Sequence, residues 1–225
     1  MTYADRISIQ VSLSGYSFRI QTGDSTEYSG WLSPDRIFTT KEFQSRHGDV
    51  EISLFTPKCT LVPSHFFSVP HSRELLADVS ELEDGDSVDH VEIPWCDAVL
   101  VYSLSVGESM SRMISGTVLR DDGSRARVLP EMYFLLRDAS LLQDYNRIVA
   151  SYADGRLYLA VFQGKTLLLA NSFSAADFST AEYFLFMVLK KLQLNPEQSQ
   201  VYFRTPLEPE WEMSLYRYFK GVEQI

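Results

Sequence analysis

The sequence predicts an α/β protein that consists of two related lobes, each built on a mixed β-sheet. Two segments, Arg6–Pro57 and Arg147–Pro206, each contain two strands joined by a tight glycine turn, then a third strand, a helix and a fourth strand. Such an internal repeat is a stronger guide to the overall architecture than the secondary-structure propensities of single segments. With 225 residues, 45% of them hydrophobic and 22% charged, the chain has the composition of a globular protein and can form one large or two small domains.

The first copy starts with two strands and a glycine turn. Apolar and polar side chains alternate over Ile7–Ser14, with the period of two that is typical of a strand with one buried face. Gly15 provides the turn, and Phe18 and Ile20 continue the alternation in the second strand. We expect a third strand over Tyr28–Leu32, after another glycine turn.

A helix and a fourth strand complete the first copy. Ser33 and Pro34 are typical of an N-cap and a first helical residue, so the sequence predicts a helix from here to His47. The apolar residues of Val50–Thr56 then predict the fourth strand.

The second copy repeats the order of the first. Asp154 and Gly155 form a dipeptide that favours a two-residue hairpin, and it joins the strands expected over Ile148–Tyr152 and Leu157–Val161. A second glycine turn leads into a third strand over Thr166–Phe173. The meander of the first copy is therefore expected again.

The helix of the second copy is expected over Asp177–Leu192, followed by a closing strand over Val201–Arg204. Its apolar residues form more than one stripe, which predicts burial on several sides. Two pairs of residues at its start have the spacing of a capping box: Ser174 with Asp177, and Ser179 with Glu182.

Further elements lie between the two copies. Apolar spacing predicts amphipathic helices over Ser72–Leu82 and Ser105–Ile114, and a strand over Asp97–Leu104. Ser105 and Glu108 are a third candidate capping box.

The most polar interruption of the chain is Arg120–Arg125, and it predicts the boundary between the lobes. We therefore expect a first lobe over residues 1–122 and a second lobe over residues 123–225. After Pro209, apolar residues recur at helical spacing up to Val222 and predict a final amphipathic helix that packs on a sheet.

Charge and hydropathy restrict the partners and the compartment. The 20 Lys+Arg and 30 Asp+Glu residues give a formal net charge of −10, and no basic patch stands out, so we predict no nucleic-acid partner. No secretory signal and no apolar stretch of roughly 20 residues is present, which predicts a cytoplasmic protein without a membrane association. Cys59 and Cys96 lack the spacing of a redox or zinc motif and are expected to be thiols packed in the core.

The order of elements in the two copies resembles the duplicated ribonuclease H-like lobes of the actin-like ATPase superfamily, which includes actin, sugar kinases, Hsp70 chaperones and pilus-assembly relatives. The segments Leu13–Phe18, Cys59–Phe67 and Leu168–Phe173, together with Asp177 and Phe178, look like an uncharacterised bacterial family of that fold. The resemblance covers nearly the whole chain. It implies an actin-like ATPase fold, with a nucleotide site between the lobes in the active members.

The two glycine turns test whether this site is intact. In active members of the superfamily, both turns carry an acidic residue that positions magnesium and phosphates. Here the first turn offers Ser14 and Gly15 and has no carboxylate, whereas the second turn keeps Asp154 and Gly155, followed by Arg156. Ser14, Gly15, Asp154 and Gly155 are therefore the candidate cofactor-binding residues, but the mismatch predicts no catalytic residue, no metal and no cofactor.

The sequence also lacks the motifs of metal chelation, serine nucleophiles and phosphate-binding loops. Cys59, His65 and His71 are six residues apart, which matches no chelating motif. The chain has no Gly-x-Ser-x-Gly nucleophile elbow and no phosphate-binding Gly-x-x-x-x-Gly-Lys loop.

Two main hypotheses of function follow. The first is a non-catalytic binding or scaffold protein with degenerate nucleotide motifs and a protein partner of unknown identity. The alternative is a divergent ATPase or kinase that binds its ligand between the lobes and holds metal with Asp154 and with Asp177 or Asp97. The resemblance adds a third hypothesis, self-association into a homo-oligomer, because actin relatives often self-associate.

Overall fold

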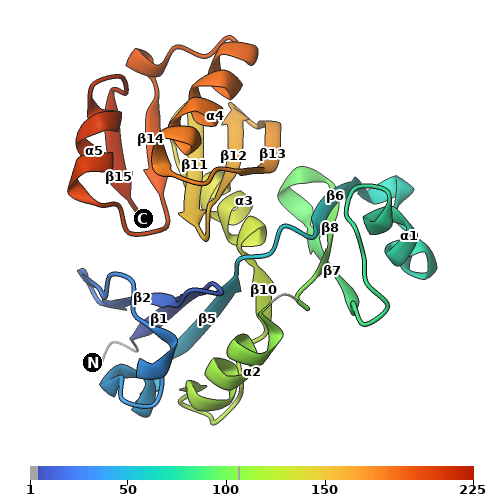
Figure 1. Cartoon of the computed structure of the whole chain (residues 1–225), viewed down its shortest axis with the longest axis vertical. Coiled ribbons are helices and arrows are strands. Elements are labelled where there is room, and N and C mark those ends of the chain that lie inside the picture. Colours follow the sequence, from blue (N-terminus) through green and yellow to red (C-terminus); the bar gives the residue numbers. More distant parts are fainter. Residues whose placement is uncertain (1–4, 106) are drawn as a thin grey trace.

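The computed structural model describes residues 5–105 and 107–225 of the chain. Two five-stranded sheets and a three-stranded sheet surround the central helix α3 (Glu131–Leu141), as Figure 1 shows. The protein is thus of the α/β class with mixed sheets, as the sequence predicts. Among the described helices, none has the length and apolar character that crossing a bilayer requires.

The first sheet has the strand order β10-β5-β1-β2-β3. β1 pairs antiparallel with β2 and parallel with β5. β3 then pairs antiparallel with β2, and β10 pairs parallel with β5. The strands of this sheet are β1 (Arg6–Val11), β2 (Tyr16–Thr22), β3 (Ser25–Tyr28), β5 (Asp49–Leu54) and β10 (Val128–Pro130).

The second sheet has the order β13-β12-β11-β14-β15, with the same succession of antiparallel and parallel pairs. Both lobes therefore share one strand topology. The strands of this sheet are β11 (Asn146–Ala153), β12 (Arg156–Gln163), β13 (Thr166–Ser174), β14 (Gln200–Phe203) and β15 (Gly221–Gln224).

A third, antiparallel sheet is inserted after β5. Its order is β6-β8-β7, and helix α1 (Ser72–Ala77) covers its outer face through Leu76. The strands are β6 (Cys59–Pro63), β7 (Val88–Ile93) and β8 (Ala98–Ser103). β8 lies within the predicted strand, whereas α1 ends five residues before the predicted helix does.

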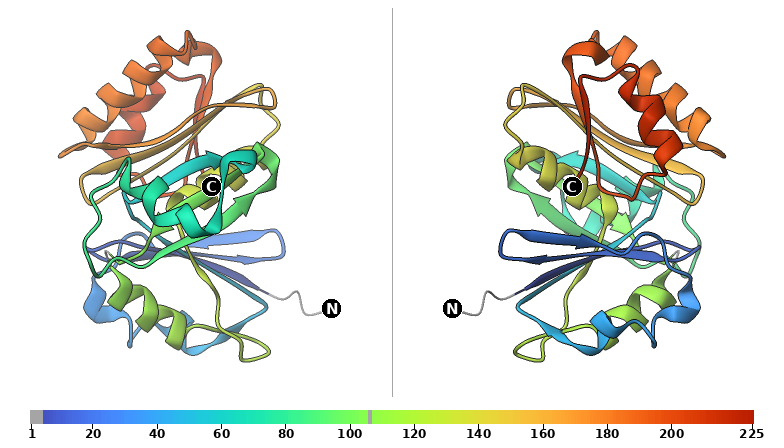
Figure 2. Two further views of the ribbon diagram at one scale, coloured as in Figure 1. Left: turned by 90° about the vertical axis from the view of Figure 1, so that its right-hand side faces the viewer. Right: turned by 90° about the vertical axis from the view of Figure 1, so that its left-hand side faces the viewer.

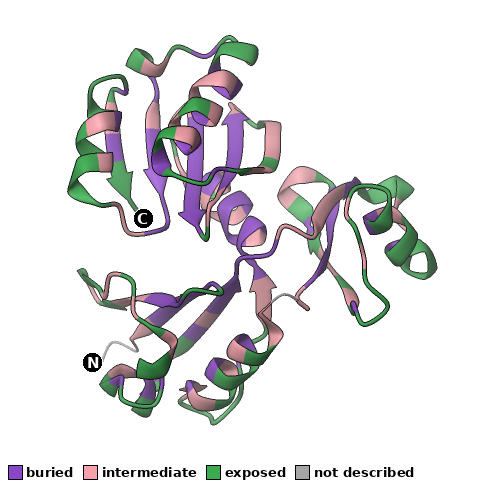
Figure 3. Cartoon of the chain, in the orientation of Figure 1, coloured by how far each residue is buried: buried purple, intermediate pink, exposed green. Residues whose placement is uncertain are grey.

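Besides the cluster under α1, three apolar cores hold the layers together, and Figures 2 and 3 show the layers and their buried faces. α2 (Glu108–Thr117) packs on the first sheet, and α4 (Phe178–Lys191) and α5 (Pro209–Tyr216) pack on the outer face of the second sheet. α3 fills the space between the inner face of the second sheet and the three-stranded sheet. The two thiols are unpaired and half-buried beside this last core, and burial raises the pKa of Cys59 to about 12.

Some predicted elements of the first copy differ in the structure. The predicted helix after Ser33 is instead two 3-10 turns, η1 (Pro34–Arg36) and η2 (Lys41–Gln44), followed by the two-residue strand β4 (Arg46–His47), which pairs with β9 (Leu119–Arg120). Extended backbone at Thr40 separates the two turns. β3 also begins three residues and ends four residues earlier than expected.

The helix starts are corrected as well. α2 begins at Glu108 after Gly107 in a left-handed conformation, so Ser105 is outside the helix and forms no capping box; residue 106 lies outside the described residues. α4 is capped by Asp177 itself, whose carboxylate accepts from Thr180 N at 2.7 Å, so neither predicted capping box forms. α4 is also exposed on one side, where Tyr183 is 63% exposed.

The C-terminal segment was predicted as one helix up to Val222, and this is wrong. α5 ends at Tyr216, and the chain then adds β15 parallel to β14. The apolar spacing of Phe219 and Val222 fits a helix, but both side chains are buried in the core of the second sheet from a turn and a strand. The boundary between residues 122 and 123 stays a prediction, and β10 takes residues beyond it into the first sheet.

Candidate functional site

The turn between β1 and β2 is held in shape by its own backbone. Ser12 N donates to Gly15 O at 2.8 Å, which closes the turn. Gly15 packs against the backbone of Leu32 so closely that a Cβ atom would lie 2.2 Å from the Leu32 carbonyl oxygen. Only glycine fits at this position.

The turn between β11 and β12 is the two-residue hairpin that the sequence predicts. Asp154 and Gly155 have φ values of 50° and 65°, which is the left-handed backbone of a type I′ turn. Gly155 reaches this conformation without cost, and aspartate is among the few other residues that tolerate it.

The structure brings the two turns together. The Asp154 carboxylate accepts from Leu13 N at 2.7 Å and from Ser14 N at 3.3 Å. Ser14, Gly15, Asp154 and Gly155 are thus neighbours at the junction of the lobes, although they are separated by about 140 positions in sequence.

The donor set at this junction does not fit a magnesium nucleotide. The backbone N–H groups that could cradle a phosphate already point at Asp154, and the first turn adds only hydroxyls, with Ser12 Oγ and Ser14 Oγ 3.1 Å apart. Magnesium in phosphoryl-transfer sites is held through carboxylates and substrate phosphates. Within residues 5–105 and 107–225, no three His, Cys, Asp or Glu side chains are grouped to hold a metal.

The other two acids of the alternative hypothesis lie elsewhere. Asp177 caps α4, and backbone N–H donation holds the pKa of its carboxyl below the usual range. Asp97 follows the turn η5 (Pro94–Cys96) with left-handed backbone, at the start of β8 in the three-stranded sheet. Neither aspartate shares a hydrogen bond with Asp154 among the described residues.

A second polar cluster at the lobe junction centres on Glu131, the first residue of α3. Glu131 is fully buried, and its Oε1 accepts from Gln10 Nε2 at 3.0 Å and from Ser151 Oγ at 2.6 Å. Arg204 Nη1 lies 2.5 Å from the same oxygen. The carboxylate therefore contacts β1 of the first sheet, β11 of the second sheet and the end of β14.

A chain of ion pairs continues from Arg204 along α3. Arg204 Nε contacts Asp138 at 2.7 Å, Asp138 contacts Arg137 at 2.8 Å, and Arg137 and Arg6 both contact Glu51 of β5. Burial raises the pKa of the Asp138 carboxyl, but Arg204 and Arg137 outweigh burial and hold it below its usual range. Arg137 and Arg6 likewise outweigh burial at Glu51 and lower its pKa.

The sequence interpretation missed this cluster because it did not identify α3. The signal is present: Pro130 stands before the helix, and the apolar residues from Met132 to Ala139 have helical spacing. Glu131 itself gives no signal of burial, because an acidic residue in the first turn of a helix is common. Its partner Arg204 is distant in sequence and has no local signal.

Comparison with solved structures identifies the fold. A protein from Bacteroides thetaiotaomicron with an actin-like ATPase fold and unknown function is 17% identical to this chain, with a TM-score of 0.66 over 100% of this chain and 91% of that chain. A chain of the PilM–PilN type IV pilus biogenesis complex is 10% identical, with a TM-score of 0.53 over 98% of this chain and 88% of that chain. The protein therefore has an actin-like ATPase fold, as the resemblance implies.

Comparison at the level of sequence gives the family. A search of curated proteins gives no match. The family model described as protein of unknown function (DUF3822) matches residues 3–222, which is nearly the whole chain. The protein belongs to this DUF3822 family.

Proposed function

We propose that the protein is a non-catalytic binding or scaffold protein that uses an actin-like ATPase fold. The observation that carries the proposal is the contact between the two turns, in which Asp154 accepts from the backbone of Leu13 and Ser14. The carboxylate occupies donors that a nucleotide phosphate would need. The alternative hypothesis, a divergent ATPase or kinase, would require this contact to open.

Catalysis of phosphoryl transfer depends on positioning and charge neutralisation rather than on covalent chemistry by the protein. The first turn supplies no carboxylate for a metal, and the carboxylate of the second turn is directed at peptide N–H groups. A magnesium nucleotide would have to replace two hydrogen bonds that the folded chain already makes. These contacts favour a binding role over hydrolysis.

A protein partner is the class of ligand that we propose. One of the similar structures is the PilM–PilN type IV pilus biogenesis complex, in which two proteins are bound to each other. The net charge of −10 disfavours nucleic acid and favours a partner with basic groups. Location in the cytoplasm is part of the same proposal.

The first experiment measures nucleotide hydrolysis and binding. Purified protein is incubated with ATP and magnesium, and calorimetric titrations use ATP, ADP and a non-hydrolysable analogue. We expect no turnover above buffer and no heat of binding. Hydrolysis that the Asp154→Ala variant abolishes would reject the proposal and support the alternative ATPase hypothesis.

Asp154 also has a structural role that can be measured. Asp154→Ala removes the acceptor and places alanine in left-handed backbone, so we expect the free energy of unfolding to fall by about 2 kcal/mol. Asp154→Asn keeps an acceptor and tolerates this backbone, so its loss should be less than half as large. Asp24→Ala, in a turn where Gly23 has the positive φ, is the matched control with a change of about 0.5 kcal/mol or less in urea unfolding. Equal losses at Asp154 and Asp24 would contradict the contact.

A further inference from the structure

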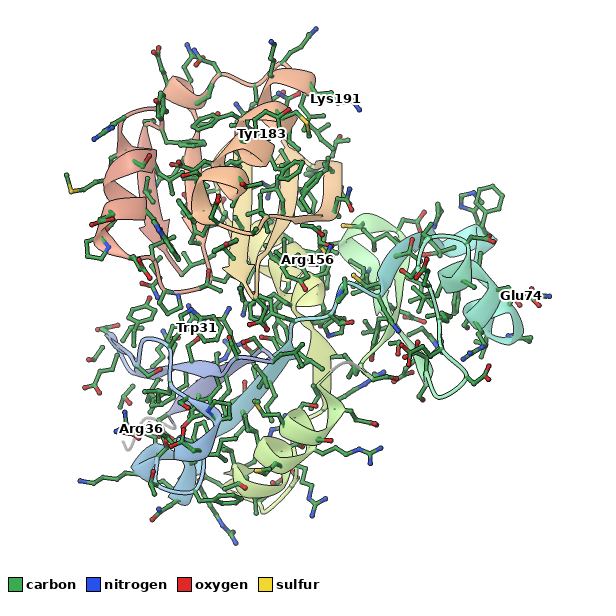
Figure 4. All side chains as sticks on the ribbon, viewed as in Figure 1. Trp31, Arg36, Glu74, Arg156, Tyr183 and Lys191 are labelled. Carbon is green, nitrogen blue, oxygen red and sulfur yellow. The ribbon has the colours of Figure 1, made fainter. Side chains whose placement is uncertain are left out.

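A groove separates the second sheet from the three-stranded sheet. Its volume is about 870 Å³, and it is lined by Ala170, Asn171 and Ser172 of β13 on one side and by residues 57–61 and 79–83 on the other. Its accessible apolar lining includes Leu61, Val79 and Leu82, whereas Leu100 and Met132 lie beneath it and are almost fully buried. Figure 4 shows Arg156, which also lines the groove, between the two sheets.

β13 is an edge strand with unusual properties. It runs for nine residues, Thr166–Ser174, without a charged residue or a proline, and no described strand pairs with its outer edge. Proteins usually protect such edges with charges, proline or short length, because an unprotected edge pairs with other chains. The other edge strands of the three larger sheets each carry such a residue: Glu27 in β3, Pro63 in β6, Asp89 and Glu92 in β7, Pro130 in β10, and Glu223 in β15.

The register shows which backbone groups of β13 point outward. Ala175 N donates to Gly155 O at 2.7 Å, and paired residues of an antiparallel ladder alternate between bonded and non-bonded pairs. Ala170 and Ser172 belong to non-bonded pairs, so their N–H and C=O groups face away from β12 and towards the groove. Ser172 N–H meets only the side chain of its neighbour Asn171, at 2.8 Å.

We propose that β13 binds an extended peptide segment of a partner protein, which pairs with its outer edge inside this groove. The inference rests on the proposed binding function and names its site. Main-chain hydrogen bonds would supply affinity, and side-chain pockets would supply specificity, as in other cases of strand addition. Every second side chain of the peptide would face the accessible apolar lining, which includes Leu61, Val79 and Leu82.

Charge defines the peptide further. Glu81 and Glu83 line the groove on the side opposite β13, and the acidic run continues to Asp89. Lys58 does not offset them, because its ammonium group pairs with Asp86 at 2.6 Å. Arg156 lies on the β13 side, where it donates to Ser172 Oγ and Ser174 Oγ. Basic side chains of the peptide are therefore expected towards Glu81 and Glu83.

A second copy of the chain fits this edge less well than a peptide does. Two copies would bring together proteins that each carry a net charge of −10. A second copy would also bring β12 and α4 along with its own β13, whereas the opposite side of the groove is already formed by residues 57–61 and 79–83. A single extended chain requires only the width of one strand, about 5 Å.

The test uses a phage-displayed library of random dodecapeptides, selected on the full chain. The tightest peptide is synthesised and titrated calorimetrically into three proteins: wild type, Ser172→Pro and Ser172→Ala. We expect selected peptides to alternate apolar residues and to contain lysine or arginine. Ser172→Pro removes the outward N–H and should weaken binding about tenfold or more, while Ser172→Ala keeps it and should change binding by about twofold or less.

Amide hydrogen exchange gives an independent readout. The amides of Ala170 and Ser172 should exchange fast in the free protein and about tenfold or more slowly with saturating peptide, whereas those of Leu169 and Asn171 should be protected in both states. If Ser172→Pro does not fold, the double reversal Glu81→Lys with Glu83→Lys replaces it, because both residues are exposed. This variant should lose affinity for the basic peptide about tenfold.

The outcomes separate this inference from the proposed function. Failure to select any peptide, or equal affinities for Ser172→Pro and Ser172→Ala, overturns the proposed site at the edge of β13. Peptides that bind elsewhere on the protein would still support the proposed binding function. A doubled mass by light scattering, with Ala170 and Ser172 protected in the absence of peptide, assigns the edge to a second copy and also overturns the proposal. ATP hydrolysis that depends on Asp154 would reject the proposed scaffold function independently of any measurement of peptide binding at β13.

Discussion

Glu131 is a fully buried acid, and its single carboxylate contacts both lobes. Removing a carboxylate from water is expensive, and the cost is offset only where partners surround the charge. Gln10, Ser151 and Arg204 all contact one oxygen of the carboxylate, Oε1, whereas the buried Oε2 has no hydrogen-bond partner within the described residues. Because Gln10 and Ser151 belong to different sheets, Oε1 keeps these contacts only when the lobes have their native arrangement.

Replacement of this acid should be costly. Glu131→Gln leaves Arg204 in the core with fewer charge partners, so we expect the free energy of unfolding to fall by about 3 kcal/mol. Glu108→Gln, which disrupts the exposed ion pair with Arg112 in α2, is the control and should cost about 0.5 kcal/mol or less. Urea unfolding monitored by tryptophan fluorescence measures both. Similar losses in the two variants would show that burial does not matter at Glu131.

Two glycine-to-alanine substitutions compare the crowded position Gly15 with the open position Gly116. A Cβ at Gly15 would overlap the Leu32 carbonyl, so Gly15→Ala should lower the free energy of unfolding by about 2 kcal/mol. A Cβ at Gly116 in α2 meets nothing within 4 Å, and alanine is the better helix former, so Gly116→Ala should raise it by about 0.5 kcal/mol. Thermal unfolding of the two variants should therefore shift in opposite directions.

Helix α4 shows how one residue fixes the start of an element. Asp177 has extended backbone, and its carboxylate satisfies the free N–H of Thr180. The carboxylate also lies at the positive end of the helix dipole. Lys190 and Lys191 lie in the last turn, at the end where the dipole favours positive charge.

Removal of the cap should weaken this helix by a definite amount. Asp177→Ala is expected to lower the free energy of unfolding by about 1 kcal/mol, whereas Asp177→Asn, an equally good cap, should cost about half of that or less. Ser179, two residues further on in the first turn, forms no capping bond, so Ser179→Ala is the matched control. A loss at Ser179 as large as at Asp177 would mean that the predicted Ser179–Glu182 box forms after all.

The elements also show what the sequence could predict. The meanders, the Asp154–Gly155 hairpin and α4 followed from alternation, turn chemistry and apolar spacing, which are local signals. β15 did not, because its residues at helical spacing are recruited as a strand by the free edge of β14. The resemblance implied a site between the lobes near both turns, but the contact of Asp154 with Leu13 and the pairing of Glu131 with Arg204 join distant segments and have no local signal in the sequence.

At the scale of the whole molecule, ion pairs run from one sheet to the other along α3. Arg6 and Glu51 belong to the first sheet, Arg137 and Asp138 to α3, and Arg204 follows β14. The charges are partly or fully buried, so salt screens them less than it screens surface pairs. The arrangement of the two lobes should therefore depend on the ionisation of Asp138 and Glu51.

Acid should weaken the molecule through these two carboxyls. Their pKa values are lowered in the folded protein, so between the folded and unfolded pKa values the unfolded chain binds more protons. The stability they contribute is fully present above about pH 5, starts to fall as the pH drops through the unfolded values near 4, and is lost below the folded values. Urea unfolding at pH 7, 5, 4 and 3 measures this slope, to which each carboxyl adds at most about 1.4 kcal/mol per pH unit. Asp138→Asn is less stable at pH 7 but should show a flatter decline between pH 4 and pH 3, and parallel declines would exclude Asp138 as a source of the acid sensitivity.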